Sequence, residues 1–101
     1  MNLKSLSGSE LLSRTKSLVA EERRVSADVL HYLREIERSR IFAEAGFSSL
    51  FTYCVEELRY SEGAAYRRIY AMRLLKECPE IEESIREGAS VFQVRVRYKD
   101  L

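Results

Sequence analysis

The residues best suited to chemistry lie between positions 66 and 76, where basic and aromatic side chains occur without a single acid. Arginine can hydrogen-bond the edge of guanine twice, lysine and arginine neutralise phosphates, and tyrosine offers a hydroxyl or a stacking face. The whole chain is almost neutral, with 17 basic and 16 acidic side chains, so this block is a local exception. It predicts contact with double-stranded DNA.

The same block has a second interpretation that the sequence leaves open. Its bases are spread around the helix, and apolar residues such as Ala65, Ile69 and Met72 lie between them. The next eleven residues, 77–87, carry five acids and one arginine. The block is therefore also typical of a central helix in a bundle, with its arginines paired to neighbouring acids.

Two helices must position the block. The pattern predicts one helix from Leu50 to Arg59, capped by Ser48 or Ser49, and a second from Glu62 to about Glu77, capped by Ser61. The short connection containing Gly63 gives residues 49–77 the outline of a helix-turn-helix, whose second helix enters the major groove. The predicted DNA contacts are Ser61, Tyr66, Arg67, Arg68, Tyr70, Arg73 and Lys76.

Few residues suit catalysis or metal binding. His31 is the only histidine, and its place between Leu30 and Tyr32 is typical of an ordinary helix residue. Cys54 and Cys78 lie in apolar surroundings and are expected to be reduced. A zinc site needs more ligands than these, and no glycine-rich phosphate loop is present. We therefore expect no enzymatic activity, no metal or cofactor and no small-molecule substrate.

A long helix precedes the pair. Ser7 and Glu10 have the spacing of a capping box, and no glycine or proline interrupts residues 9–45. Side chains three and four residues apart predict one stripe on a helix that runs to about Arg38. The stripe consists of Leu11, Thr15, Leu18, Glu22, Val25, Val29, Leu33 and Ile36. It must pack on the rest of the chain or on a second copy.

The remaining segments complete an all-α fold in a single domain, residues 1–101. A helical turn over 41–45 ends at Gly46, and a short helix begins at Pro79 and ends at Gly88. In the tail, residues 89–101, apolar and polar side chains alternate from Phe92 to Tyr98, which favours a strand or irregular structure over a helix.

Composition and the stripe bear on location and partners. Apolar residues make up 46% and charged residues 33% of a chain without a long apolar run or a secretion signal. We expect a cytoplasmic protein without a membrane partner.

A homodimer is expected, because helix-turn-helix modules gain affinity by pairing half-sites. Its predicted interface is Leu18, Val25, Val29, Leu33, Ile36, Val94 and Val96. The rival to DNA binding is a module for protein interaction or self-association alone.

Residues 6–87 resemble the N-terminal helical domain of bacterial HNH-endonuclease-type proteins. The most specific part is Tyr60–Leu75, beginning Tyr-Ser-Glu-Gly-Ala-Ala-Tyr-Arg-Arg-Ile, preceded by Gly-Phe-Ser-Ser-Leu-Phe at 46–51. In that family a C-terminal HNH nuclease follows, but its metal-binding histidines match nothing here, and residues 91–101 depart from the family's polar helix. The resemblance implies a DNA-associated helical domain that does not cut DNA.

Overall fold

A computed structural model describes residues 2–87, and in these residues the fold is all-α, as predicted. A short 3-10 helix, η1 (Leu3–Ser5), precedes five α-helices. They are α1 (Gly8–Ser39), α2 (Ile41–Glu44), α3 (Leu50–Glu56), α4 (Glu62–Glu77) and α5 (Glu80–Arg86). No strand occurs within residues 2–87, and the alternating tail 89–101 lies outside the described residues.

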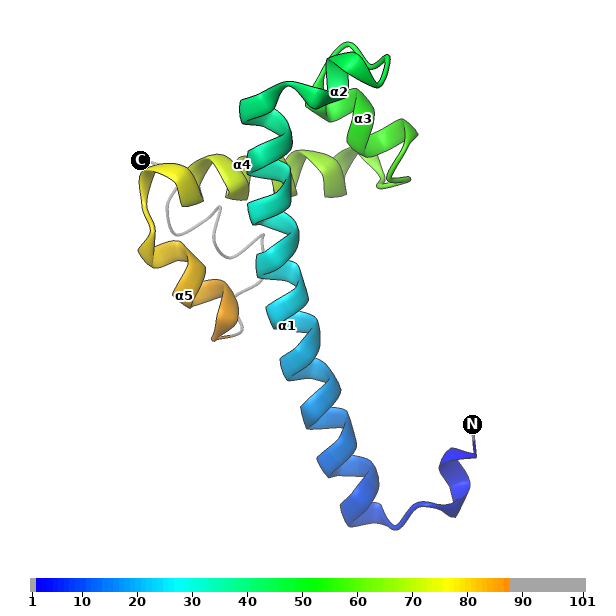
Figure 1. Ribbon diagram of the computed structural model, residues 1–101. Coiled ribbons are helices and arrows are strands. Elements are labelled where there is room, and N and C mark those ends of the chain that lie inside the picture. The colour runs from blue at the N-terminus through cyan, green and yellow to red at the C-terminus, as the bar shows by residue number, and fades with distance from the viewer. Residues whose placement is uncertain (1, 88–101) are drawn as a thin grey trace.

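Helix α1 runs the length of the molecule. Its 32 residues span about 48 Å at the usual rise per residue. Ser7 caps its start, because the Ser7 Oγ accepts a hydrogen bond from the backbone N–H of Glu10 at 3.1 Å. Figure 1 shows its second half crossing α4, while its first half extends away from the other helices. The predicted long helix is confirmed, but only half of it packs on the bundle.

Helix α4 is the centre of the bundle, with α1, α3 and α5 packed around it. The core has a small contribution from α1, namely Ala27, Leu30 and Leu33. Six of the 16 residues of α4 are buried: Ala65, Ile69, Ala71, Met72, Leu74 and Leu75. Phe42, Leu50, Cys54 and Ile85 complete the core. Because so much of the circumference of α4 packs against other helices, only a narrow face of α4 remains open to a ligand.

The turns between helices use left-handed backbone at three residues. Gly46 has φ +95°, as its predicted position after α2 requires, while Arg40 and Arg59 adopt φ +58° and +65°. In the turn before α4, the residue with left-handed backbone is therefore Arg59. Gly63, which was expected in this turn, lies within the first turn of α4. Helix α3 ends at Glu56 rather than at Arg59, because the backbone N–H of Leu58 and that of Tyr60 turn back onto the carbonyls of Tyr53 and Cys54.

The serine caps were predicted correctly. The Ser49 Oγ accepts from the backbone N–H of Thr52 at 3.0 Å, and the Ser61 Oγ accepts from that of Ala64 at 3.1 Å. Each cap satisfies a backbone donor that the first turn of a helix leaves without a partner. Within residues 2–87, no helix combines the length and the apolar character that crossing a membrane requires.

Candidate functional site

Two of the arginines predicted to contact DNA make contacts within the chain. The Arg68 guanidinium lies over the Tyr60 ring, 4.4 Å from its centroid, and its Nη1 donates to the Ala64 carbonyl at 3.2 Å. Arg73 on α4 binds Glu37 on α1, with 2.8 Å between Nη2 and Oε2. Both arginines are therefore engaged within the chain, although neither pairs with the acids of residues 77–87 that the structural interpretation expected: Arg68 contacts Tyr60 and Ala64, and Arg73 pairs with Glu37 on α1.

The remaining predicted residues divide between solvent and local contacts. Tyr66 is half exposed and stacks on Tyr70, with 6.3 Å between ring centroids. Lys76 is exposed and Arg67 half-buried, and neither has an acidic partner among residues 2–87. The Ser61 hydroxyl is the cap of α4. The outward side of α4 also carries exposed Glu62 and Glu77, so it has mixed charge.

A groove of about 600 Å³ lies between the end of α1, α2, α3 and α4. Aromatic and basic side chains dominate its wall: Arg40, Phe42, Phe51, Tyr66, Tyr70 and Arg73. Arg40 lies 5.5 Å from the centroid of the Phe42 ring, and Phe51 and Tyr66 are exposed. Sequence reasoning missed both: Arg40 lies outside the helix-turn-helix pattern, and Phe51 lies on the first helix of the pair, whose expected role was to support the second.

The first half of α1 contains the longest uninterrupted run of exposed residues among residues 2–87. Every residue from Ser7 to Val25 is exposed. Five large apolar side chains belong to this segment: Leu11, Leu12, Leu18, Val19 and Val25. We call this segment the projecting half of α1. Its apolar side continues the predicted stripe without any covering element in residues 2–87.

The predicted dimer interface must be corrected at its C-terminal end. Leu33 is only 2% exposed and belongs to the core, while Val29 and Ile36 are partly buried against it. Leu33 therefore packs inside the chain and is unavailable to a second copy. Leu18 and Val25 stay accessible. Val94 and Val96 lie outside the described residues.

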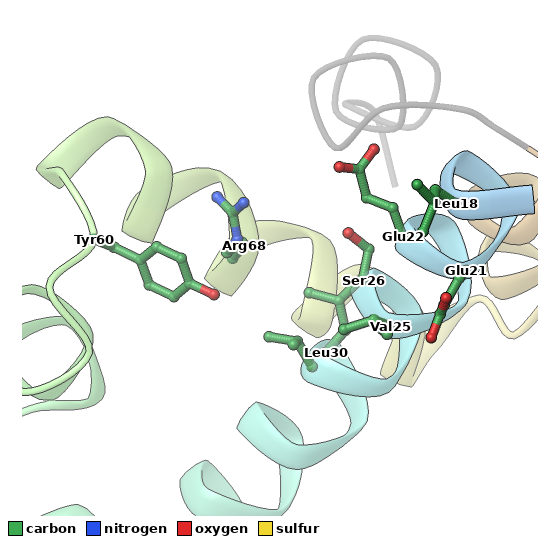
Figure 2. Close-up of a pocket in the computed structure, with 9 residues that line it drawn as sticks. Leu18, Glu21, Glu22, Val25, Ser26, Leu30, Tyr60 and Arg68 are labelled. Atoms are coloured by element: carbon green, nitrogen blue, oxygen red, sulfur yellow. The ribbon is translucent and has the colours of Figure 1, made fainter. Parts of the chain in front are cut away.

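A second groove, of about 400 Å³, lies where the projecting half meets the bundle. Figure 2 shows Tyr60 and Arg68 on one side of it and side chains of α1, including Leu18, Glu22 and Val25, on the other. An adjoining apolar groove shares Val25, Val29 and Tyr60 with it and adds Tyr32 and Leu58, among others. The apolar stripe thus leads from the projecting half directly into two hollows of the surface.

The ionisable side chains outside these grooves have contacts that support the fold. His31 Nε2 on α1 donates to Glu82 Oε1 on α5 at 2.8 Å, since a carboxylate can only accept. This bond and the one from Arg86 hold the pKa of Glu82 below its ordinary value. The pKa of the Cys78 thiol is raised to about 11, chiefly by its hydrogen bond with Glu80, and burial raises the pKa of Cys54. Within residues 2–87, no three His, Cys, Asp or Glu residues cluster as metal ligands.

Comparisons with protein-family models, with curated proteins and with solved structures found no match for this chain. The resemblance to the helical domain of HNH-endonuclease-type proteins therefore stays a prediction.

Proposed function

We propose that this chain is a non-catalytic helical module that self-associates as a homodimer through the projecting half of α1. One observation carries the proposal: an apolar stripe runs along residues 7–25, yet every residue of this segment is exposed. Most helical stability in proteins comes from packing an amphipathic face on other elements, and this segment has no such packing within residues 2–87. A helix that extends from its own bundle with apolar side chains exposed is suited to packing on another chain.

The energetics favour a modest but specific association. Burying one leucine or valine side chain contributes about 1.5–3 kcal/mol. Several such side chains from each copy are needed to offset the loss of translational and rotational freedom on association, which costs at least about 4 kcal/mol. The projecting half contributes five large apolar residues from each copy. We therefore expect a dimer that dissociates on dilution.

Light scattering of the full chain over a range of concentrations tests this proposal. The mass should rise from 11.8 kDa toward twice that value. Leu18→Asp should keep the chain monomeric, because it places a carboxylate in the stripe. Ala20→Asp is the matched control, because Ala20 is also exposed but lies on the opposite side of α1. A constant monomer mass for the wild type would contradict the proposal.

Duplex DNA binding is the second candidate function. Two features favour it: α3 and α4 follow each other as a helix-turn-helix pair, and Arg67 and Lys76 lack acidic partners within residues 2–87. The groove that contains Arg40, Phe51 and Tyr66 also opens on α4. The intramolecular contacts of Arg68 and Arg73 weigh against it. Fluorescence polarisation on random duplex at two salt concentrations tests this function, because phosphate contacts give a steep salt dependence.

A further inference from the structure

The stripe on the projecting half of α1 has an internal symmetry. Leu11 and Val25 lie seven residues before and after Leu18, and all three are exposed on the same side of the helix. A spacing of seven is the repeat that lets two α-helices pack along each other. We propose that two copies of this chain pack antiparallel along α1, with a twofold axis at Leu18. The proposal rests on the proposed self-association and specifies its geometry.

The apolar contacts follow from the position of the axis. Leu18 of one copy meets Leu18 of the other, and each Leu11 meets Val25 of its partner. Val25 borders both grooves at the junction with the bundle. In this register, the hollow formed by Val25, Val29 and Tyr32 receives Leu11 of the second copy.

Two charged side chains are also placed symmetrically about Leu18, and they determine whether the two helices run parallel or antiparallel. Arg14 lies four residues before Leu18, and Glu22 lies four residues after it. An antiparallel pair therefore places each Arg14 opposite Glu22 of the second copy, twice per dimer. A parallel pair would instead place Glu22 against Glu22 and Arg14 against Arg14. Opposed like charges disfavour that arrangement.

Both side chains are available for this pairing. Arg14 lies 3.8 Å from Glu10, and both side chains are more than half exposed, so the contact is weak. Glu22 has no hydrogen bond or ion pair within residues 2–87 and lines the groove beside Leu18 and Val25. In Figure 2 the Glu22 carboxylate lies on the α1 side of that groove. Arg14 of a second copy would neutralise it there.

Disulfide trapping in the full chain distinguishes the two directions. The background is Cys78→Ser, with Cys54 kept because it is fully buried. Two chains, one with Leu11→Cys and one with Val25→Cys, are mixed under mild oxidation at a concentration where light scattering shows a dimer. A disulfide needs Cα atoms within about 7 Å. The mixture should give the Leu11–Val25 cross-link, and each variant alone should give little. Efficient self-linking of either variant, without the mixed product, would show parallel packing and overturn the proposal.

Leu18→Cys should self-link in either direction and serves as the control for oxidation. Failure of Leu18→Cys to cross-link in a protein that scatters as a dimer would place the interface elsewhere and overturn the register. A protein that scatters as a monomer would instead contradict the proposed self-association. The two failures are therefore distinguishable.

Charge reversal gives an independent check of the Arg14–Glu22 contact. Arg14→Glu and Glu22→Arg should each raise the dimer dissociation constant by roughly tenfold, because two attractive contacts become repulsive. The double variant should recover most of the wild-type affinity. Arg24→Glu, which lies about 120° around α1 from Leu18 and is exposed, is the control and should change little. Additive losses in the double variant would overturn the pairing, because they would show that Arg14 and Glu22 contribute independently of each other.

Discussion

Leu18 and Leu33 lie on the same side of α1, about four helical turns apart, yet Leu18 is 65% exposed and Leu33 only 2% exposed. One stripe of one helix therefore serves two purposes. The half that contains Leu33 packs on α4 and completes the core, while the half that contains Leu18 projects from the bundle. The change from buried to exposed occurs between Ala27 and Val25.

The first prediction uses this contrast. Leu33→Ala should lower the free energy of unfolding by about 2–4 kcal/mol, because it leaves a cavity in the core. Leu18→Ala, measured at a concentration where the chain is monomeric, should cost less than about 0.5 kcal/mol. Urea denaturation followed by circular dichroism measures both. Equal costs for the two variants at that concentration would mean that the projecting half is covered within the monomer.

The second prediction concerns DNA. If the second candidate function holds, Arg67→Ala with Lys76→Ala should weaken duplex binding and reduce its salt dependence by about one unit of slope per lost phosphate contact. The control is Arg23→Ala with Arg24→Ala, an equally basic pair on the projecting half. Equal effects of the two double variants would show that α4 has no special part in binding.

Arg68 should behave differently from Arg67. Its guanidinium stacks on Tyr60 and hydrogen-bonds Ala64, so Arg68→Ala removes packing as well as charge. We expect Arg68→Ala to lower the free energy of unfolding by about 1 kcal/mol. Arg67→Ala should be nearly neutral in the same denaturation experiment. A neutral Arg68→Ala variant would indicate that the stacking contributes no stability.

The third prediction concerns pH. The pKa of Glu82 is lowered by hydrogen bonds from His31 and Arg86, so its ionised form stabilises the folded chain. This contribution is present above the ordinary glutamate pKa of about 4.3 and is lost as the pH falls through the lower folded value. Glu82→Gln should therefore cost about 0.5–1 kcal/mol at pH 7 and less at pH 3.

Thermal or urea denaturation at the two pH values measures this difference. Glu83→Gln is the matched control, because Glu83 is exposed and has no ion pair within residues 2–87. If the cost of Glu82→Gln did not depend on pH, the Glu82 side chain would stabilise the fold through its packing and not through its negative charge.

The fourth prediction concerns thiol reactivity. With its pKa raised to about 11, Cys78 should be alkylated slowly at pH 8 although it is partly exposed, because the thiolate is the reactive form. Glu80→Gln should accelerate the reaction at least several-fold by removing the main cause of the shift, while Glu83→Gln should not. Mass spectrometry of iodoacetamide-treated protein gives the rates. Cys54 should react only on unfolding, because it is fully buried.

Local sequence signals predicted the starts of the helices correctly. The features that were not predicted depend on contacts or backbone conformations that residues within one turn do not indicate. Ser7, Ser49 and Ser61 marked the starts of helices because a serine cap depends on residues within one turn. Left-handed backbone at Arg40 and Arg59 has no such signal, since glycine is the residue expected there.

Two of the predicted site residues, Leu33 and Arg73, have contacts that local patterns do not indicate. Periodicity predicts which side of a helix is apolar but not how far along the helix a neighbour covers it, so Leu33 was assigned to an interface. The partner of Arg73 is Glu37, on another helix and 36 residues away in sequence. No local pattern indicates that such an arginine is already engaged.

Hydrogen exchange at two protein concentrations tests the central claim most directly. If self-association occurs through the projecting half of α1, the backbone amides of residues 11–25 should gain protection as the concentration rises through the dissociation constant. The amides of α4 should change little, because α4 is already buried within each copy. Unchanged exchange of residues 11–25 over a hundredfold range of concentration, with the same mass throughout, would contradict the claim.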